Sequence, residues 1–216
     1  MKQSNTLKES LGSFLHNLWD LMILNWLWLL CSLPLITVGP ASCALYYVTL
    51  KLVRGEAVYP VKDFFRTFRE NLKPGLLLGL LAAALLVVAA GDAFFALQQT
   101  GMLQTVYLVI AVMVGALFLT LTCFTFPLQA MFENPLKTQL KNAFLLAFTA
   151  PGKTLLLWVI ALIPVAAALL LPPVALQMLG FLYVILGASG PVFLSSRILR
   201  DLFDRVNGAP VIQTEE

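Results

Sequence analysis

The stretch Leu33-Pro34-Leu35-Ile36-Thr37-Val38-Gly39-Pro40-Ala41 interrupts a long apolar region near the start of the chain. Proline lacks a backbone N–H and its ring clashes with the preceding helical turn, so the two prolines and the glycine predict a helix break at 34–40. Inside a bilayer, a broken backbone needs protein or water to satisfy its freed polar groups. The break is therefore either a tight hairpin between two helices, which we favour, or a solute or anion site like those at the discontinuous helices of transporters.

Four residues of this break are candidate structural or functional residues: Pro34, Thr37, Gly39 and Pro40. A helix that begins at Pro40 would direct free, partially positive N–H groups toward the break, which is the physical basis of the anion-site interpretation. A second Gly-Pro pair, in Ser189-Gly190-Pro191, predicts a kink with close helix packing in the last apolar segment.

Apolar segments of membrane-spanning length make up most of the sequence. The chain is 60% hydrophobic and 12% charged, whereas soluble domains carry about 25% charged residues. A helix needs about 20 apolar residues to cross a bilayer. Segments that meet or approach this length are 18–38, 75–90, 102–126, 154–171 and 174–196, whereas 40–53 is apolar but short, about 20 Å at 1.5 Å per residue.

These segments predict an all-α, polytopic transmembrane bundle that forms a single domain over residues 1–216. We expect six membrane helices, of which the first two are a hairpin broken at 34–40. The alternative is five crossings, in which 40–53 does not return across the membrane.

Lysine and arginine decide the orientation, because basic loops stay in the cytoplasm. They gather at 51–73, 131–153 and 197–205, whereas the connections at 91–101 and 171–174 have none. The C-terminus is therefore predicted to be cytoplasmic. Six crossings also place the N-terminus, with Lys2 and Lys8, in the cytoplasm, whereas five crossings place it outside.

The basic stretches have the periodicity of amphipathic helices. Val61, Phe64, Phe65, Phe68 and Leu72 share one helical face, and similar patterns occur at 1–17, 133–148 and 198–206. Such helices lie at the membrane interface, and we expect them on the cytoplasmic side. The basic residues that we single out there, called the predicted basic face, are Arg54, Arg66, Arg69, Lys137, Lys141, Arg197 and Arg200. Residues 207–216 are predicted to be a flexible tail.

Residues suited to chemistry are sparse. Cys31, Cys43 and Cys123 lack the spacing of a metal or redox site, and the sequence contains one histidine, His16, as a further potential ligand. The sequence contains no metalloprotease or serine-hydrolase motif, and no long basic run of the kind that binds nucleic acid. We therefore predict no enzyme activity, cofactor or metal, and we expect Asn25 and Gln129 to bridge helices.

Several blocks resemble the YesL family of bacterial membrane proteins. They are the quoted stretch, the Ala44-Leu45-Tyr46-Tyr47 that follows it, Lys51-Leu52-Val53-Arg54-Gly55-Glu56, Phe64-Phe65 with Phe68 and Asn71, and Phe126-Pro127-Leu128 followed by Leu140-Lys141-Asn142-Ala143. The likeness covers most of the chain. The family is itself a domain of unknown function, found largely in Gram-positive bacteria and often encoded near carbohydrate ABC importers and glycan-degrading enzymes.

The resemblance implies a bacterial cell-membrane setting and supplies no catalytic residues. The leading hypothesis is a non-enzymatic accessory protein that assists or regulates carbohydrate uptake through protein contacts. The alternative is a small-solute transporter or channel with a site near the 34–40 break, and a third hypothesis is lipid-directed packing by the amphipathic helices. Expected partners are membrane lipids, subunits of a carbohydrate ABC importer and further copies of the chain, but not nucleic acid.

Overall fold

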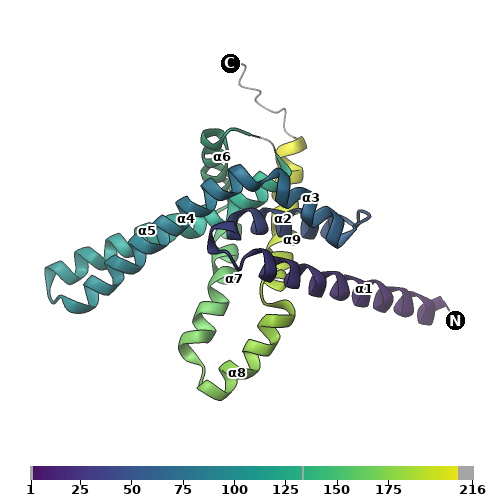
Figure 1. Ribbon diagram of the computed structural model, residues 1–216, viewed down its shortest axis with the longest axis horizontal. Coiled ribbons are helices and arrows are strands. Elements are labelled where there is room, and N and C mark those ends of the chain that lie inside the picture. The colour runs from purple at the N-terminus through teal and green to yellow at the C-terminus, as the bar shows by residue number, and fades with distance from the viewer. Residues whose placement is uncertain (1, 133, 209–216) are drawn as a thin grey trace.

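The computed structural model describes residues 2–132 and 134–208, with side chains described from residue 16 to residue 204 apart from 133. Over these residues the chain is helical and contains no strand, so the all-α prediction is confirmed (Figure 1). In chain order the elements are α1 (Lys2–Cys31), η1 (Leu35–Thr37), α2 (Val38–Arg54), α3 (Pro60–Glu70), α4 (Leu72–Gln98), α5 (Met102–Met131), α6 (Leu136–Thr149), α7 (Pro151–Leu170), α8 (Pro173–Leu182), the π-helix η2 (Tyr183–Gly187) and α9 (Ser189–Gly208).

Both predicted terminal segments extend beyond what is described. The backbone of 2–17 is helical as part of α1, but the side chains that would make it amphipathic, up to residue 15, lie outside the described residues. Of the predicted tail, residues 207–208 still belong to α9, and residues 209–216 lie outside the described residues.

Helix α2 lies at the centre of the molecule and packs against α1, α3, α4, α5 and α9. In its apolar window 56% of the residues are buried, compared with 11% in α4 and 17% in each of α5 and α7. The helix ends at Gly55, whose positive φ of 72° suits a residue without a Cβ. Two backbone bonds close this end, from Gly55 N to Leu52 O at 3.1 Å and from Glu56 N to Lys51 O at 3.1 Å, the pattern of a Schellman cap.

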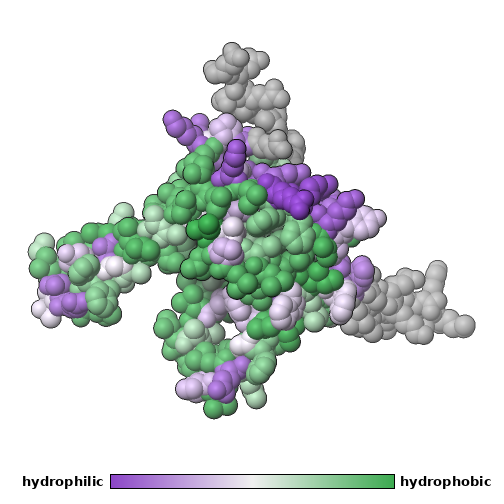
Figure 2. All heavy atoms as spheres, viewed as in Figure 1, coloured by the Kyte–Doolittle hydropathy of each residue, from purple (hydrophilic) through white to green (hydrophobic). Residues whose placement is uncertain are grey.

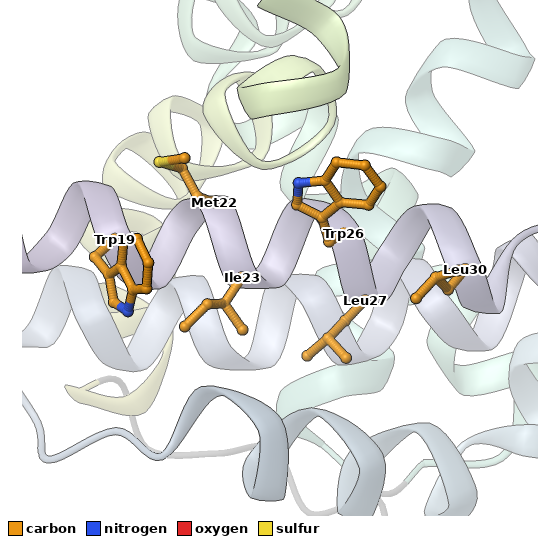
Figure 3. A pocket seen from close by; sticks show the side chains of 6 residues that line it. All are labelled: Trp19, Met22, Ile23, Trp26, Leu27 and Leu30. Carbon is orange, nitrogen blue, oxygen red and sulfur yellow. The ribbon is translucent and has the colours of Figure 1, made fainter.

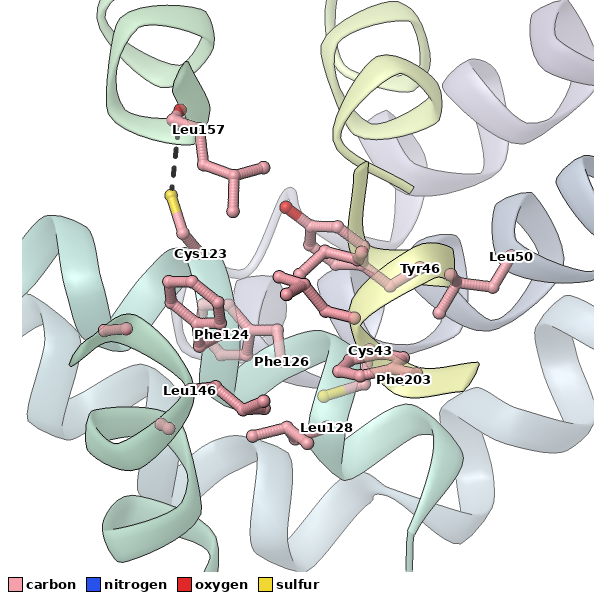
Figure 4. Close-up of a cluster of buried hydrophobic side chains, with 14 of the residues drawn as sticks. Cys43, Tyr46, Leu50, Cys123, Phe124, Phe126, Leu128, Leu146, Leu157 and Phe203 are labelled. Carbon is pink, nitrogen blue, oxygen red and sulfur yellow. Dashed lines mark hydrogen bonds between the residues drawn. The ribbon is translucent and has the colours of Figure 1, made fainter. Parts of the chain in front are cut away.

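The larger buried cluster joins α2, α4, α5, α6, α7 and α9 (Figure 4). Phe124, Leu157 and Phe203 are almost fully buried in it. The ring of Phe203 meets Phe132 edge to face, with centroids 5.8 Å apart. A geometry of this kind adds a modest amount beyond burial of the rings, and it fixes α9 against the end of α5.

Two apolar arms leave this centre in different directions: the α4–α5 hairpin, and α7 with α8 (Figure 1). Their surfaces are apolar over most of their length (Figure 2), and side chains such as Met102 (85% exposed) and Leu170 (81% exposed) have no protein cover. Helices of 27 and 30 residues rise roughly 40 Å or more, which exceeds the hydrocarbon thickness of about 30 Å. The apolar surface of the arms suits a lipid environment.

Among the described residues, four helical stretches are long and apolar enough to cross a membrane: Leu35–Arg54, Leu72–Gln98, Met102–Met131 and Pro151–Leu170. A fifth results if Pro173–Gly187 and Ser189–Asp204, bent by 53° at the break between them, form one span. The six predicted crossings are therefore not confirmed. This set of five also differs from the predicted alternative, because it contains 40–53 and leaves out 18–38.

The break shortens the apolar part of α1. Helix α1 already ends at Cys31, so its apolar part from Leu18 rises only about 21 Å, less than the hydrocarbon thickness of about 30 Å. Residues 35–37 instead join α2, and the combined stretch of 20 residues reaches spanning length.

Candidate functional site

The 34–40 break is closed by its own side chains. Thr37 donates through Oγ1 to Cys31 O at 2.5 Å and to Pro34 O at 2.6 Å, and its backbone N–H also donates to Pro34 O at 2.7 Å. The carbonyl groups at the end of a helix otherwise lack partners. Thr37 thus satisfies the last carbonyl of α1, at Cys31, while Leu35 and Ile36 remain exposed.

Gly39 and Pro40 pack directly against the backbone of α4. A Cβ built on Gly39 would collide with the carbonyl oxygen of Gly75, and one built on Gly75 would lie 2.8 Å from Pro40 Cα. Gly79, one turn further along α4, would place a Cβ 3.3 Å from Gly39 Cα. Glycines four residues apart allow such close helix contact in membranes. The geometry here is that of a tight turn, with Pro34 exposed and Gly39 and Pro40 buried.

A second break, at η2, is bound by a side chain from α1. Asn25 is completely buried. Its Nδ2 donates to Tyr183 O at 3.2 Å and to Val184 O at 2.8 Å, and its Oδ1 accepts from Ala188 N at 2.8 Å and from Ser189 N at 3.2 Å. One amide therefore satisfies backbone groups on both sides of the bend, which confirms the prediction that Asn25 bridges helices.

A polar hollow lies where α3 passes into α4, beside the end of α5. Gln129 of α5 donates through Nε2 to Asn71 Oδ1 at 3.1 Å, as predicted for a bridging amide, and Asn71 Nδ2 donates to Thr67 O at 3.0 Å. Next to this pair the hollow has a volume of about 640 Å³ and is lined by Tyr47, Glu70, Asn71, Pro74, Gln129, Ala130, Met131, Phe132 and Asn134. Pockets of about 300–1,000 Å³ are of ligand size.

A smaller hollow, of about 350 Å³, is an apolar trough along α1 alone, lined by Trp19, Met22, Ile23, Trp26, Leu27 and Leu30. Met22 and Trp26 point to one side of the helix and Ile23 and Leu27 to the other, so the trough is open rather than enclosed (Figure 3). Trp19 is 62% exposed and Trp26 50% exposed. Indole rings of this kind favour the membrane–water interface.

The predicted basic face divides into two groups. Arg54 pairs with Asp204 at 3.1 Å, Arg66 with Asp63 at 3.3 Å, and Arg200 donates to Val53 O at 3.2 Å. Arg197 lies over the ring of Phe193, 4.8 Å from its centroid. Each of these four side chains therefore has a partner within the protein. Within the described side chains, Arg69, Lys137 and Lys141 are exposed and make no ion pair.

The sequence interpretation missed the residues of the polar hollow other than Gln129, and the glycines of α4 that receive the break. Both leave a signal in the sequence. Glu70-Asn71 immediately precedes an apolar segment and Asn134 closely follows one, as polar residues do when they line the mouth of a bundle. Gly75 and Gly79 have the small-x-x-x-small spacing of close helix contacts. Among the described residues, no group of three or more metal-ligating side chains is present.

The arrangement defines the class of protein: an all-helical chain whose several long apolar helices indicate a multi-pass membrane protein. A family model described as "Protein of unknown function, DUF624" matches residues 21–93, which contain both the 34–40 break and α3. The chain is also 29% identical over 161 residues to "Uncharacterized protein YesL" of Bacillus subtilis (strain 168), which covers 73% of this chain and 76% of the relative. No solved structure matches the chain significantly. Together these two matches confirm the resemblance to the YesL family.

Proposed function

We propose that this chain is a non-enzymatic accessory membrane protein that assists or regulates carbohydrate uptake through contacts with other proteins. The observation that carries the proposal is the set of exposed cationic and apolar side chains on α6. Lys137 and Lys141 are exposed, and Leu145 (53% exposed) and Phe148 (80% exposed) lie along the same helix. An exposed apolar surface with polar residues at its edge is typical of a site that contacts a protein or a membrane, and we propose a protein at this one.

The carbohydrate setting is supported by the family resemblance alone, because members of the YesL family are often encoded near carbohydrate ABC importers. The accessory role is also supported by the membrane helices. Charged groups inside apolar segments mark transport pathways, and residues 75–90, 102–126 and 154–171 contain no Asp, Glu, Lys or Arg.

The test is affinity capture from membranes of the native host. The intact chain is expected to recover importer subunits, and Lys137→Glu with Lys141→Glu should reduce their recovery severalfold. A matched control, Gln98→Glu with Thr100→Glu, adds the same number of acidic groups near the tip of the α4–α5 arm and should leave recovery unchanged. Consistent failure of the intact chain to recover any importer subunit would exclude the accessory role.

A second candidate function, small-solute transport, is favoured by the polar hollow beside Asn71 and Gln129. The purified chain in liposomes should carry no sugar or anion if it is an accessory protein. Specific flux that is lost in a Gly39→Leu protein that stays folded would support transport through the 34–40 break, and specific flux lost in a folded Gln129→Leu protein would support transport through the hollow. Either result would overturn the accessory role as the sole function.

A further inference from the structure

Helix α3 presents three different faces along its length. Its inward face is formed by Asp63, Phe64 and Thr67, which are buried. The Phe64 ring stacks on Phe68 with centroids 6.3 Å apart. The carboxylate of Asp63 forms an ion pair with Lys51 of α2, with Nζ and Oδ2 3.3 Å apart. This face accounts for how α3 is held against the bundle.

The second face is apolar and has no protein cover. Tyr59, just before the helix, is 68% exposed, Val61 is 49% exposed and Phe65 is 39% exposed. Val61 and Phe65 lie four residues apart and therefore on one side of the helix. The apolar stripe predicted for this segment is thus wider than the bundle can bury.

The third face is cationic. Lys62, Arg69 and Lys73 are exposed, and within the described side chains none of them makes an ion pair. Arg66 lies on the same side, where it pairs with Asp63 at 3.3 Å and donates to Tyr47 Oη at 3.1 Å. Glu70 is the exposed acid of this helix. The exposed side of α3 and the start of α4 therefore carries a net positive charge.

The position of α3 places these faces at the surface of the bilayer. Asn71 alone separates α3 from α4, and α4 has the length and apolarity of a membrane span. Its exposed apolar surface begins by Leu77, which is 56% exposed and lies about 8 Å along the helix from Leu72. Figure 2 shows the same boundary, with a hydrophilic band over α3 beside apolar surface.

We infer that α3 is an interfacial helix that binds anionic phospholipid. Val61 and Phe65 enter the boundary of the acyl chains, and Lys62, Arg69 and Lys73 hold the headgroup phosphates. Amphipathic helices with a basic polar face bind membranes in this way, and each cation near an anionic surface strengthens the attraction. The occupant that we propose is a lipid because the apolar and cationic faces are adjacent and α3 leads directly into α4, which has the length and apolarity of a membrane span.

The test measures lipid selectivity of the full chain in nanodiscs of phosphatidylcholine that contain a trace of spin-labelled lipid. Spin-labelled phosphatidylglycerol is expected to associate with the protein several times more strongly than spin-labelled phosphatidylcholine. The triple variant Lys62→Gln/Arg69→Gln/Lys73→Gln should reduce this preference by about fivefold or more, since one cation near the surface is worth roughly that factor. The preference should also fall as salt is added.

The matched control, Lys62→Arg/Arg69→Lys/Lys73→Arg, exchanges the same side chains and keeps their charge, so it should retain the preference. An intact chain without preference for phosphatidylglycerol would overturn the inference and leave a protein partner to cover the cations. A neutralised variant that keeps the full preference would overturn it equally.

A second measurement addresses the depth of the two faces. In a Cys31→Ser background, spin labels at Phe65→Cys and Lys62→Cys report access to oxygen, which concentrates in lipid, and to a water-soluble nickel chelate. The label at position 65 should favour oxygen and the label at position 62 the chelate. Equal access of the chelate to both positions would place α3 in water and contradict the inference.

Discussion

The Asn25 side chain lies 2.8 Å from the carbonyl oxygen of Val184, although 159 residues separate them in the chain. Val184 belongs to η2, where the helical hydrogen-bond ladder shifts and the path bends by 53° before α9. A π-helical turn leaves backbone groups without their usual partners. The buried amide of α1 supplies those partners, so the end of the bundle depends on the first helix of the chain.

Replacement of Asn25 by leucine should destabilise the protein by about 2 kcal/mol or more, because the variant leaves buried backbone N–H and C=O groups unpaired. Unfolding in detergent measures this loss. Hydrogen exchange at residues 183–189 should also accelerate, since their bonds open locally.

Gln177 provides the matched control, because it is an exposed amide on α8 for which the described part of the chain gives no side-chain hydrogen bond. Gln177→Leu should change stability by no more than about 0.5 kcal/mol. An equal loss in both variants would mean that the Asn25 bonds do not stabilise the bend.

The second prediction concerns the close contact between Gly39 and Gly75. Because a Cβ at Gly39 would collide with Gly75 O, Gly39→Ala must separate α2 from α4, at a cost of about 1–3 kcal/mol. Thermal unfolding in detergent measures it. Gly115→Ala is the control, since a Cβ there meets nothing within 4 Å and alanine is the better helix former by up to about 1 kcal/mol. A Gly39→Ala protein as stable as Gly115→Ala would contradict the close packing.

Local chemistry explains what the sequence could predict. Prolines at 34 and 40 predicted a break, and the structure has one between Cys31 and Val38. The periodicity of 61–72 predicted an amphipathic helix, and α3 occupies Pro60–Glu70. Both depend on neighbours within two helical turns, which the sequence displays directly.

The partners of these elements depend on the tertiary fold and were not predictable in the same way. The bend near the C-terminus is centred on Tyr183–Gly187, one turn before the predicted Gly190-Pro191. Pro191 lacks the N–H that would bond to the carbonyl of Gly187 and its ring clashes there, so the distortion falls on the preceding turn. The side-chain amide that hydrogen-bonds to the bent backbone is that of Asn25, near the opposite end of the sequence.

The acidic residues of α9 show the same limit. The spacing of these acids would allow pairing with the arginines of the same helix, as i,i+4 neighbours do. The structure instead pairs Asp204 with Arg54 of α2 at 3.1 Å and Asp201 with Lys153 of α7 at 3.7 Å, although Asp201 also lies 3.4 Å from Arg200. These charges join helices that only the fold brings together.

The third prediction concerns the hydrogen bond between Gln129 and Asn71. A double-mutant cycle of Asn71→Leu and Gln129→Leu should give a coupling energy of about 1 kcal/mol, within the range found for polar pairs in membrane proteins. Unfolding in detergent supplies the four free energies. Thr122 serves as the control partner, because its hydroxyl bonds only to carbonyls of its own helix. Coupling between Asn71→Leu and Thr122→Val as large as that with Gln129→Leu would show that the measured energy is not the hydrogen bond.

The fourth prediction concerns the first helix, and its test distinguishes five membrane crossings from six. The five spans of adequate length, with the C-terminus in the cytoplasm, would leave α1 and the N-terminus outside, where Lys2 and Lys8 are unfavourable. We therefore expect α1 to cross with α2 and Asn5→Cys to be shielded in intact cells. An impermeant maleimide should label Gln99→Cys at the α4–α5 connection directly, and Asn5→Cys only after permeabilisation.

The unmodified chain controls for its own cysteines, of which Cys43 and Cys123 are buried and Cys31 is half-buried. If Asn5→Cys is labelled from outside as fast as Gln99→Cys, five helices cross and α1 lies on the outer surface. Its apolar trough would then be an outer interfacial face, and the amide of Asn25 would reach the bend at η2 from that side of the bilayer. Shielding of Asn5→Cys would instead mean that the short apolar part of α1 crosses with the help of its contacts to α2 and η2.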